Sequence, residues 1–293
     1  MEGLIIKILS NQVEIKCNGE VVTCYIRGKL RHDKLLPLVG DKVIFNKDKK
    51  IIEKILPRKN ELRRPSVSNI TQGLLVASLK HPDLDTNLID KILVELEFNN
   101  IKPIICFTKR DLLNKEELNN IQFILDYYAK LYPVYYNDEI DKIKKIFQNE
   151  ITVFVGQTGA GKSTLLNMLD DNLMLKTGEI SDALGRGRHT TRHVELLELL
   201  GGELLDTPGF SALEFPNMMK KEIRDAFIEF QNYPCMYRDC MHIKEEGCNV
   251  CKKVETGEIA SFRYQNYLDL VKTGQDEGEK YKRRERWKLQ YHI

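Results

Sequence analysis

A glycine-rich loop is the most specific chemical signal in this sequence. Residues 156–164 match the phosphate-binding pattern G-x-x-x-x-G-K-[ST], between an expected strand at 151–155 and an expected helix at 162–169. Its glycines let backbone N–H groups converge on phosphates at a helix N-terminus. We expect Lys162, as a catalytic residue, to neutralise the β- and γ-phosphates, and Ser163 to bind Mg²⁺. The predicted nucleotide contacts of this loop are Gly156, Gln157, Thr158, Gly159, Ala160, Gly161, Lys162, Ser163 and Thr164.

A second pattern, Asp206-Thr-Pro-Gly209, follows a short expected strand downstream of the loop. Asp206 is predicted to hold the metal, directly or through water, and the Gly209 N–H to contact the γ-phosphate. Alone, D-x-x-G is a common turn. At a strand end after a phosphate-binding loop, it supports a nucleoside triphosphate site.

A third pattern, Thr108-Lys109-Arg110-Asp111, closes an expected strand and matches [NT]-K-x-D, the guanine-recognition motif of GTPases. The Asp111 carboxylate can accept the N1–H and 2-amino hydrogens of guanine. Adenine lacks both donors, so ATP would leave a charged acceptor unpaired. We expect Lys109 to lay its stem against the base; the alternative is an ordinary charged loop. The four predicted base-site residues are Thr108, Lys109, Arg110 and Asp111.

The order of these motifs is itself informative. In ordinary GTPases the phosphate-binding loop comes first and the base-reading motif last, whereas here the base-reading motif precedes the loop. A circular permutation explains this order, because chain ends that lie close together can be rejoined. The sequence therefore predicts a circularly permuted P-loop GTPase domain.

Residues 181–192, between the loop and D-x-x-G, are rich in glycine and basic residues and are predicted to form a mobile loop. A threonine there can complete the Mg²⁺ shell. We favour Thr190 and leave Thr191 open. Phe210 follows D-T-P-G where many GTPases carry a glutamine that orients water, so slow intrinsic hydrolysis is expected. The nearest polar candidate for positioning water is His189, which we predict to be catalytic.

A Cys/His cluster lies near the C-terminus, with the spacing C-x4-C-x-H-x5-C. Four such ligands suit one closed, structural Zn²⁺ site per chain. Buried free thiols are the alternative, and Cys251 competes with His242 for the fourth position. The predicted metal ligands are Cys235, Cys240, His242 and Cys248.

Three kinds of element must position these motifs. About five short strands in residues 3–56, with an Asn18-Gly19 turn, predict a small barrel of the OB-fold type. Residues 57–65 are predicted to be a linker. Strands at 73–79, 104–107, 151–155 and 204–205 alternate with helices at 86–98, 115–131 and 162–169, which indicates a parallel sheet. The chain is helical after about residue 214.

Composition agrees with a multidomain α/β protein. The chain has 293 residues, 30% of them charged, and 7 cysteines, which favours a cytoplasmic protein with a metal site over a secreted disulfide scaffold. No signal peptide and no membrane span are expected. Residues 1–64 carry 15 Lys/Arg against 8 Asp/Glu, and the last 14 residues carry six against one. Two basic ends indicate a polyanionic partner, although solvated surfaces would have the same composition.

The permuted motifs, between a small barrel and the Cys/His cluster, resemble the RsgA (YjeQ/YloQ) family of bacterial GTPases. The resemblance covers essentially the whole chain, including the G-R-G-R-H-T-T string at 185–191. It implies an OB-fold RNA-binding domain at 1–62, a permuted GTPase domain at 63–213 and a helical zinc-binding domain at 214–293. It also implies GTP, Mg²⁺ and Zn²⁺ as cofactors, with the 30S ribosomal subunit and its 16S rRNA as partners of a monomer. The expected activity is ribosome-stimulated GTP hydrolysis during late 30S maturation.

Three features depart from the family pattern, and one of them is the additional cysteine Cys251, beside which His242 is preferred as ligand because it matches that pattern. Thr108 replaces the commoner asparagine, which should weaken a hydrogen bond between loops, and Tyr135-Tyr136-Asn137 lacks the usual Ser-Ala, so no site residue is assigned there. Two other functions stay open. One is a GTP-dependent RNA-binding switch acting on tRNA or mRNA; the other is an ATP-driven nucleic-acid-binding protein, against which Asp111 argues.

Overall fold

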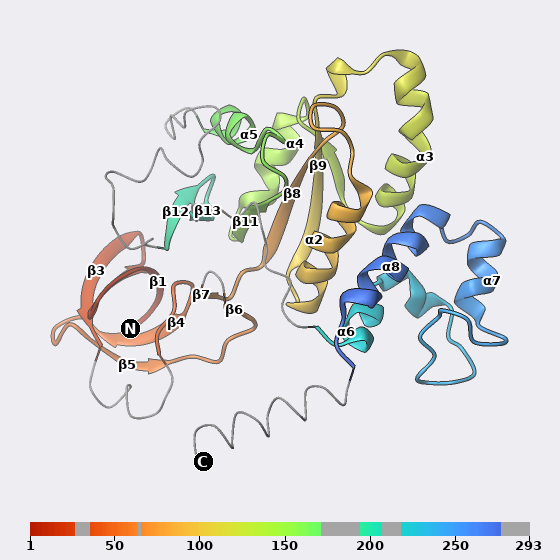
Figure 1. The fold of residues 1–293 in the computed structure, drawn as a ribbon. Helices are drawn as coiled ribbons and strands as arrows, with labels where there is room; N and C mark the ends of the chain where they lie inside the picture. Colours follow the sequence, from red (N-terminus) through yellow and green to blue (C-terminus); the bar gives the residue numbers. More distant parts are fainter. Residues whose placement is uncertain (27–35, 64–65, 171–193, 207–217, 277–293) are drawn as a thin grey trace. The chain divides into compact units, whose positions relative to one another are not determined.

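The computed structural model describes residues 1–26, 36–63, 66–170, 194–206 and 218–276. The chain forms two compact units (Figure 1). Unit 1 comprises Met1–Leu84, Asn99–Asn119 and Tyr132–Leu213, and unit 2 comprises Asp85–Phe98, Asn120–Leu131 and Glu214–Ile293. The domain boundaries after residues 62 and 213 stay a prediction. No helix within the described ranges has the length and apolarity needed to cross a membrane.

The first five strands of unit 1 curl into the ring at the N-terminal end of Figure 1. They are β1 (Glu2–Leu9), β2 (Gln12–Cys17), β3 (Glu20–Tyr25), β4 (Lys42–Asn46) and β5 (Ile51–Ile55). The ring closes because β1 pairs with β4 as well as with β2. Alternate residues point inward, so that Val13, Ile15 and Phe45 are fully buried. The predicted five-stranded barrel is confirmed.

The segment predicted to be a linker is part of the packed structure instead. Arg58 donates to Asp41 from Nε (2.7 Å) and Nη2 (2.8 Å), and its side chain is only 13% exposed. Residues beyond it form β6 (Glu61–Arg63), which pairs with β7 (Ser66–Ser68). The linker prediction was wrong because a charged segment can be ordered by a buried carboxylate that lies elsewhere in the chain.

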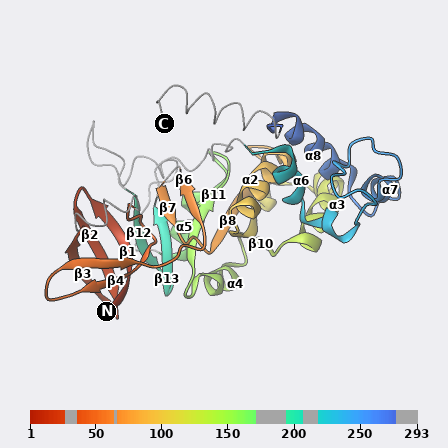
Figure 2. The ribbon, with the colours of Figure 1, turned by 90° about the horizontal axis from the view of Figure 1, so that it is seen from below.

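The central sheet of unit 1 carries the nucleotide motifs. Its strands are β10 (Val134–Tyr136), β9 (Lys102–Thr108), β8 (Gln72–Ser78), β11 (Ile151–Val155), β13 (Gly202–Asp206) and β12 (Glu195–Leu199), adjacent in that order. All neighbours are parallel except β12 and β13. Strands β8 and β11 are buried along their whole length, as expected for parallel strands covered on both faces. The predicted parallel sheet is confirmed, and Figure 1 shows its strands β8 and β9 next to each other. Figure 2 views the same sheet from below.

The three expected helices are present with the predicted bounds: α2 (Thr86–Phe98), α3 (Lys115–Leu131) and α5 (Lys162–Leu169). A shorter helix, α4 (Ile140–Lys144), precedes β11. In unit 1, apolar residues of α5 join Leu74, Val76 and Phe154 in one core. The P-loop is therefore joined on both sides to rigid, packed elements.

Unit 2 contains α2, the later part of α3, and the C-terminal helices α6 (Lys220–Asp225), α7 (Asn249–Glu255) and α8 (Ser261–Thr273). Its core includes Val94 of α2 together with Phe227, Phe230 and Tyr267. The three aromatic rings lie 4.9–5.3 Å apart, centroid to centroid. The helical C-terminal region predicted from the sequence is confirmed.

A buried ion cluster joins α2 and α8 inside unit 2. Arg263 is fully buried and donates to Asp90 Oδ1 (2.5 Å) and Glu229 Oε1 (2.8 Å). The Asp90 carboxylate also accepts from the Tyr128 hydroxyl (2.6 Å) and the Asn266 amide (2.7 Å). Removing one partner of such a pair costs about 3–5 kcal/mol, because the other charge is left buried without compensation.

Candidate nucleotide site and metal centre

The P-loop bends sharply between β11 and α5. Gly156 has φ 135°, and a Cβ at this position would lie 2.1 Å from the Val76 carbonyl oxygen of β8. Only glycine fits this close approach of two backbones. Gly161 has φ 94° and caps the N-terminus of α5. The loop therefore has the strand–glycine–helix geometry that a phosphate cradle requires.

Lys162, the first residue of α5, has its ammonium group inside this loop. Its Nζ donates to the carbonyl oxygens of Gly156 (2.5 Å) and Gln157 (2.8 Å). Burial lowers the pKa of Lys162 to about 8. Ser163 beside it is 7% exposed. The glycine cradle, the ammonium and the hydroxyl fit a bound Mg²⁺–triphosphate.

The structure brings the base-recognition motif to the P-loop. Thr108 ends β9, and its hydroxyl donates to the Ala160 carbonyl oxygen at 2.6 Å. Lys109 adopts a left-handed conformation, with φ 61°, and its Nζ donates to the Gly159 carbonyl oxygen at 2.8 Å. Thr108 thus retains a bridging hydrogen bond where asparagine is commoner.

The remaining two residues of the motif lie at its exposed side. Arg110 and Asp111 form the start of a short 3-10 turn, Arg110–Leu112, and both are exposed. The Arg110 guanidinium lies over the Tyr136 ring of β10, 4.6 Å from its centroid. Asp111 is accessible to a base placed beside Lys109. Tyr136, to which we assigned no role, supports the motif from the neighbouring strand.

Sequence reasoning missed the segment after β8. The His81 carbonyl oxygen accepts a hydrogen bond from Lys109 Nζ, and Pro82 Cδ lies 3.6 Å from the position of a Cβ on Gly159. This segment thus contacts both nucleotide motifs. The segment has no sequence motif of its own. It does follow β8, which lies between the two motif-bearing strands β9 and β11, and this position at the carboxyl end of a parallel strand could have indicated a binding segment.

Several predicted residues lie outside the described residues. They are His189 and Thr190, the alternative Thr191, and Gly209. Asp206 is the last residue of β13, which runs parallel to β11, although its side chain is not described. Its backbone lies at the carboxyl end of the strand beside the P-loop strand, and its metal-holding role stays a prediction.

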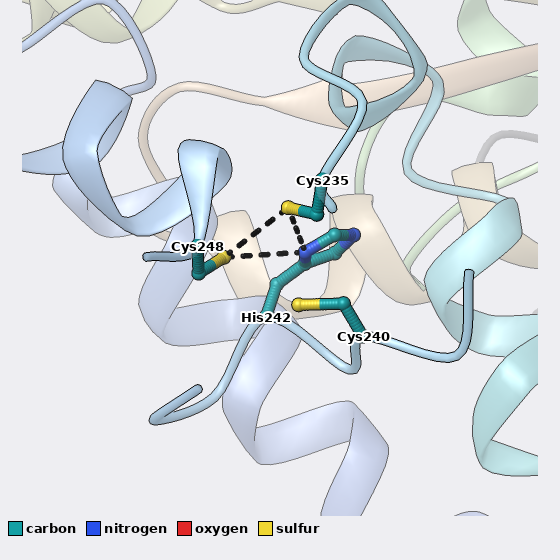
Figure 3. Close-up of side chains that lie close together, drawn as sticks. All are labelled: Cys235, Cys240, His242 and Cys248. Atoms are coloured by element: carbon teal, nitrogen blue, oxygen red, sulfur yellow. Dashed lines mark hydrogen bonds between the residues drawn. The ribbon is translucent and has the colours of Figure 1, made fainter. Parts of the chain in front are cut away.

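The predicted metal ligands form a compact cluster in unit 2 (Figure 3). One ligand atom from each of Cys235, Cys240, His242 and Cys248 lies within 4.8 Å of the other three. Cys235 Sγ and Cys248 Sγ are 3.7 Å apart, and His242 Nδ1 lies 3.5 Å and 3.4 Å from them. A tetrahedral zinc ion requires roughly 3.8 Å between sulfurs and 3.6 Å between sulfur and nitrogen. The cluster is consistent with zinc, with His242 binding through Nδ1.

The surrounding backbone supports this cluster. The N–H groups of Asn249 and Cys251 point to the sulfurs of Cys235 (3.3 Å) and Cys248 (3.4 Å). The Glu245 carboxylate accepts from the N–H groups of Met241, Ile243 and Lys244 at 2.6–3.0 Å. Burial acts to raise the pKa of Glu245, but these hydrogen bonds outweigh it and lower the pKa. Such outer contacts hold metal ligands in place.

Cys251 lies beside the cluster but makes different contacts. Its thiol lies 3.6 Å from the His242 carbonyl oxygen and 3.5 Å from the Tyr264 hydroxyl. Tyr264 itself donates to the same carbonyl oxygen at 2.7 Å. The structure therefore groups His242, and not Cys251, with the other three predicted ligands.

The fold and the site together define a P-loop GTPase in circularly permuted order. Its base-recognition strand β9 precedes the P-loop strand β11 in the chain, yet both face one nucleotide site. The family model of the RsgA GTPase matches residues 55–216, and that of the RsgA N-terminal domain matches residues 2–51. The chain belongs to the RsgA GTPase family.

Curated relatives and solved structures agree. A protein of Enterococcus faecalis named small ribosomal subunit biogenesis GTPase RsgA is 44% identical over 280 residues, which cover 92% of this chain and 94% of that protein. The crystal structure of YjeQ from Thermotoga maritima is similar, with a TM-score of 0.81 and 34% identity over 92% of this chain and 96% of that one. YloQ, described as a circularly permuted GTPase, has a TM-score of 0.79 and 36% identity, with coverage of 92% and 93%.

Proposed function

We propose that this protein hydrolyses GTP to GDP and phosphate while it assists late maturation of the 30S ribosomal subunit. The observation that carries the proposal is the pair of hydrogen bonds from Thr108 and Lys109 to the P-loop. These bonds combine a guanine-reading loop and a phosphate cradle in one site. The names of the relatives, small ribosomal subunit biogenesis GTPases, supply the biological setting.

The proposed roles follow from chemistry. Asp111 accepts the N1–H and 2-amino hydrogens of guanine, and Lys162 neutralises the β- and γ-phosphates. The N–H groups of residues 156–164 and of Gly209 bind phosphate oxygens. Ser163, Asp206 and Thr190 hold Mg²⁺, which when bound neutralises the charge that develops on the phosphates.

His189 positions the attacking water in this proposal. Its imidazole accepts a hydrogen bond from water and aligns it with the γ-phosphate when the ribosomal subunit orders the surrounding loop. Phe210, at the place where many GTPases use glutamine, offers no such acceptor. Turnover is consequently slow without the subunit.

One zinc ion per chain holds the four-residue cluster as a structural centre. Four protein ligands close a tetrahedral site and leave no position for substrate. The distances between the ligand atoms support this role. The region around α7 and α8 would then depend on the metal for its stability.

The proposed partners are the 30S subunit and its 16S rRNA. The protein would bind them as a monomer in the cytoplasm. Basic residues supply the attraction to phosphates, among them Lys59 and the C-terminal set Lys282, Arg283, Arg284 and Arg286. Arg58 is not counted among these basic residues, because Asp41 and Glu61 engage its guanidinium.

The test is GTP turnover measured with and without purified 30S subunits, with excess ATP as competitor. We expect slow turnover alone, strong stimulation by 30S subunits and no effect of ATP. Stimulation by tRNA or mRNA but not by 30S subunits would favour a general RNA-binding switch. Competition by ATP would remove the guanine assignment.

A further inference from the structure

The barrel is tied to one particular hairpin of the nucleotide-binding sheet, within unit 1. Strand β1 pairs antiparallel with β12 at Lys7 and Glu195, whose side chains also form an ion pair. On β2, Lys16 Nζ lies 2.8 Å from Glu198 Oε2 and 2.7 Å from Glu203 Oε1. We call these five residues the hairpin seam. Both ribbon views place the β12–β13 hairpin beside β1 (Figures 1 and 2).

The β12–β13 hairpin lies in the chain between the two segments proposed to act in GTP hydrolysis. β12 begins at Glu195, shortly after His189 and Thr190 in the sequence. β13 runs parallel to the P-loop strand β11 and ends at Asp206, where D-x-x-G begins. The two ends of the hairpin therefore continue into the two segments proposed to hold water, metal and γ-phosphate.

Within the seam, the Lys16–Glu203 pair is more enclosed than an ordinary surface ion pair, whereas Glu198 is 69% exposed. The side chains of Lys16 and Glu203 are 26% and 10% exposed. The pair Lys47–Glu20, whose residues both lie on the surface of the barrel, is 49% and 68% exposed at a similar distance of 2.7 Å. Exposed pairs contribute little because water and salt screen them, whereas loss of one partner from an enclosed pair leaves a poorly solvated charge.

We propose that Lys7 and Lys16 are positioning residues for GTP hydrolysis, which couple the barrel to the β12–β13 hairpin. When the barrel binds the ribosomal subunit, the seam carries its displacement to the hairpin and so to the segments at both hairpin ends. The inference rests on the proposed function, since it requires stimulation by the 30S subunit. Neither lysine belongs to the nucleotide site.

A double-mutant cycle tests this coupling. The full-length variants are Lys16→Met, Glu203→Gln and the double variant, with Lys47→Met as the matched barrel control. Basal turnover, GTP affinity, 30S affinity and turnover at saturating 30S subunits are measured for each. Coupling between sites commonly amounts to about 5- to 150-fold. We expect each single variant to lose at least about fivefold of the 30S stimulation, with basal turnover and GTP affinity unchanged.

The double variant should lose no more than Lys16→Met alone, because both changes break the Lys16–Glu203 contact and Lys16→Met already removes the contact with Glu198. If the losses of 30S stimulation in the two single variants multiply in the double variant, the proposed coupling through the seam is wrong. An equal loss of stimulation in Lys47→Met would also contradict it. If 30S subunits stimulate the wild type and both single variants alike, the inference alone fails. If they do not stimulate the wild type, the proposed function fails and the inference with it. Should Lys16→Met unfold, Lys7→Met tests the other end of the seam, and unchanged stimulation there overturns the proposal.

Discussion

The nucleotide site and the Cys/His cluster are built in opposite ways. The cluster takes its four ligands from one short stretch, Cys235 to Cys248, and its ligand atoms converge within 4.8 Å. The nucleotide site joins Thr108 to Ala160, which are 52 residues apart, through the order of strands β9, β8 and β11. A metal centre can thus be a local property of the chain, whereas base and phosphate recognition here depends on the whole sheet.

The largest expected effect is loss of the metal centre by Cys240→Ser. Structural zinc contributes about 10 kcal/mol or more to folding, so residues 225–293 should unfold. Nucleotide binding should be largely retained, because the nucleotide site is built separately. Zinc content, limited proteolysis and GDP affinity measure these outcomes. Cys251→Ser is the control and should keep its zinc; protein purified under reducing conditions without any zinc would remove the assignment.

The second-largest effect is expected in the nucleotide site, at Asp111. Asp111→Asn presents a donor where guanine also donates, whereas xanthine has a carbonyl there. We expect GTP affinity to fall on the order of 10³-fold and XTP affinity to rise. Competition binding with both nucleotides measures the change, and Glu116→Gln on the neighbouring helix serves as the control. Unchanged GTP binding by Asp111→Asn would show that the base is read elsewhere.

A somewhat smaller effect is expected for His189→Ala. The variant should bind GTP and 30S subunits normally but lose stimulated turnover on the order of 10²-fold, the usual contribution of a general acid–base group. Single-turnover hydrolysis on saturating 30S subunits is the measurement. His193→Ala controls for removing a nearby imidazole. Wild-type rates in His189→Ala would place the water-positioning group on another residue or on the ribosome.

The smallest effect concerns pH. The Lys162 ammonium has a pKa of about 8 because it is buried, and a bound triphosphate would raise that pKa. The protonated form therefore binds GTP better. Affinity should be nearly constant below about pH 7 and fall about tenfold between pH 7 and pH 9. Lys162→Arg does not titrate there, so it reports any pH effect of the nucleotide itself. Parallel pH profiles of the two proteins would contradict the expectation.

The sequence predicted the parts of the nucleotide site better than their connections. Residues 156–164 between a strand and a helix could be assigned because glycine spacing and hydrophobic periodicity are local signals. The contacts from Thr108 to Ala160 and from Lys109 to the His81 carbonyl oxygen could not, since backbone acceptors have no sequence signature. Because the Ala160 carbonyl acceptor could not be foreseen, we expected Thr108 to form a weaker hydrogen bond than the commoner asparagine.

The metal cluster was nearly complete in the sequence, because its ligand types and spacing carry the chemistry. What the sequence left open was the choice between His242 and Cys251, which depends on the conformation of the chain. His242 has φ 56°, and this turn points its ring toward Cys235 and Cys248. Arg58 shows the same limit, since its partner Asp41 lies 17 residues away.

The buried contact between Arg263 and Asp90 limits which segments can be exchanged between two related proteins in a chimera. The partners lie 173 residues apart, and α2 enters the chain between two strands of the nucleotide-binding sheet. A chimera joined at residue 214 would combine Asp90 from one parent with Arg263 from the other. If either parent carries a different residue at position 90 or 263, the hybrid has a buried charge without its partner. Between parents that differ at either position, the C-terminal region must therefore be exchanged together with α2.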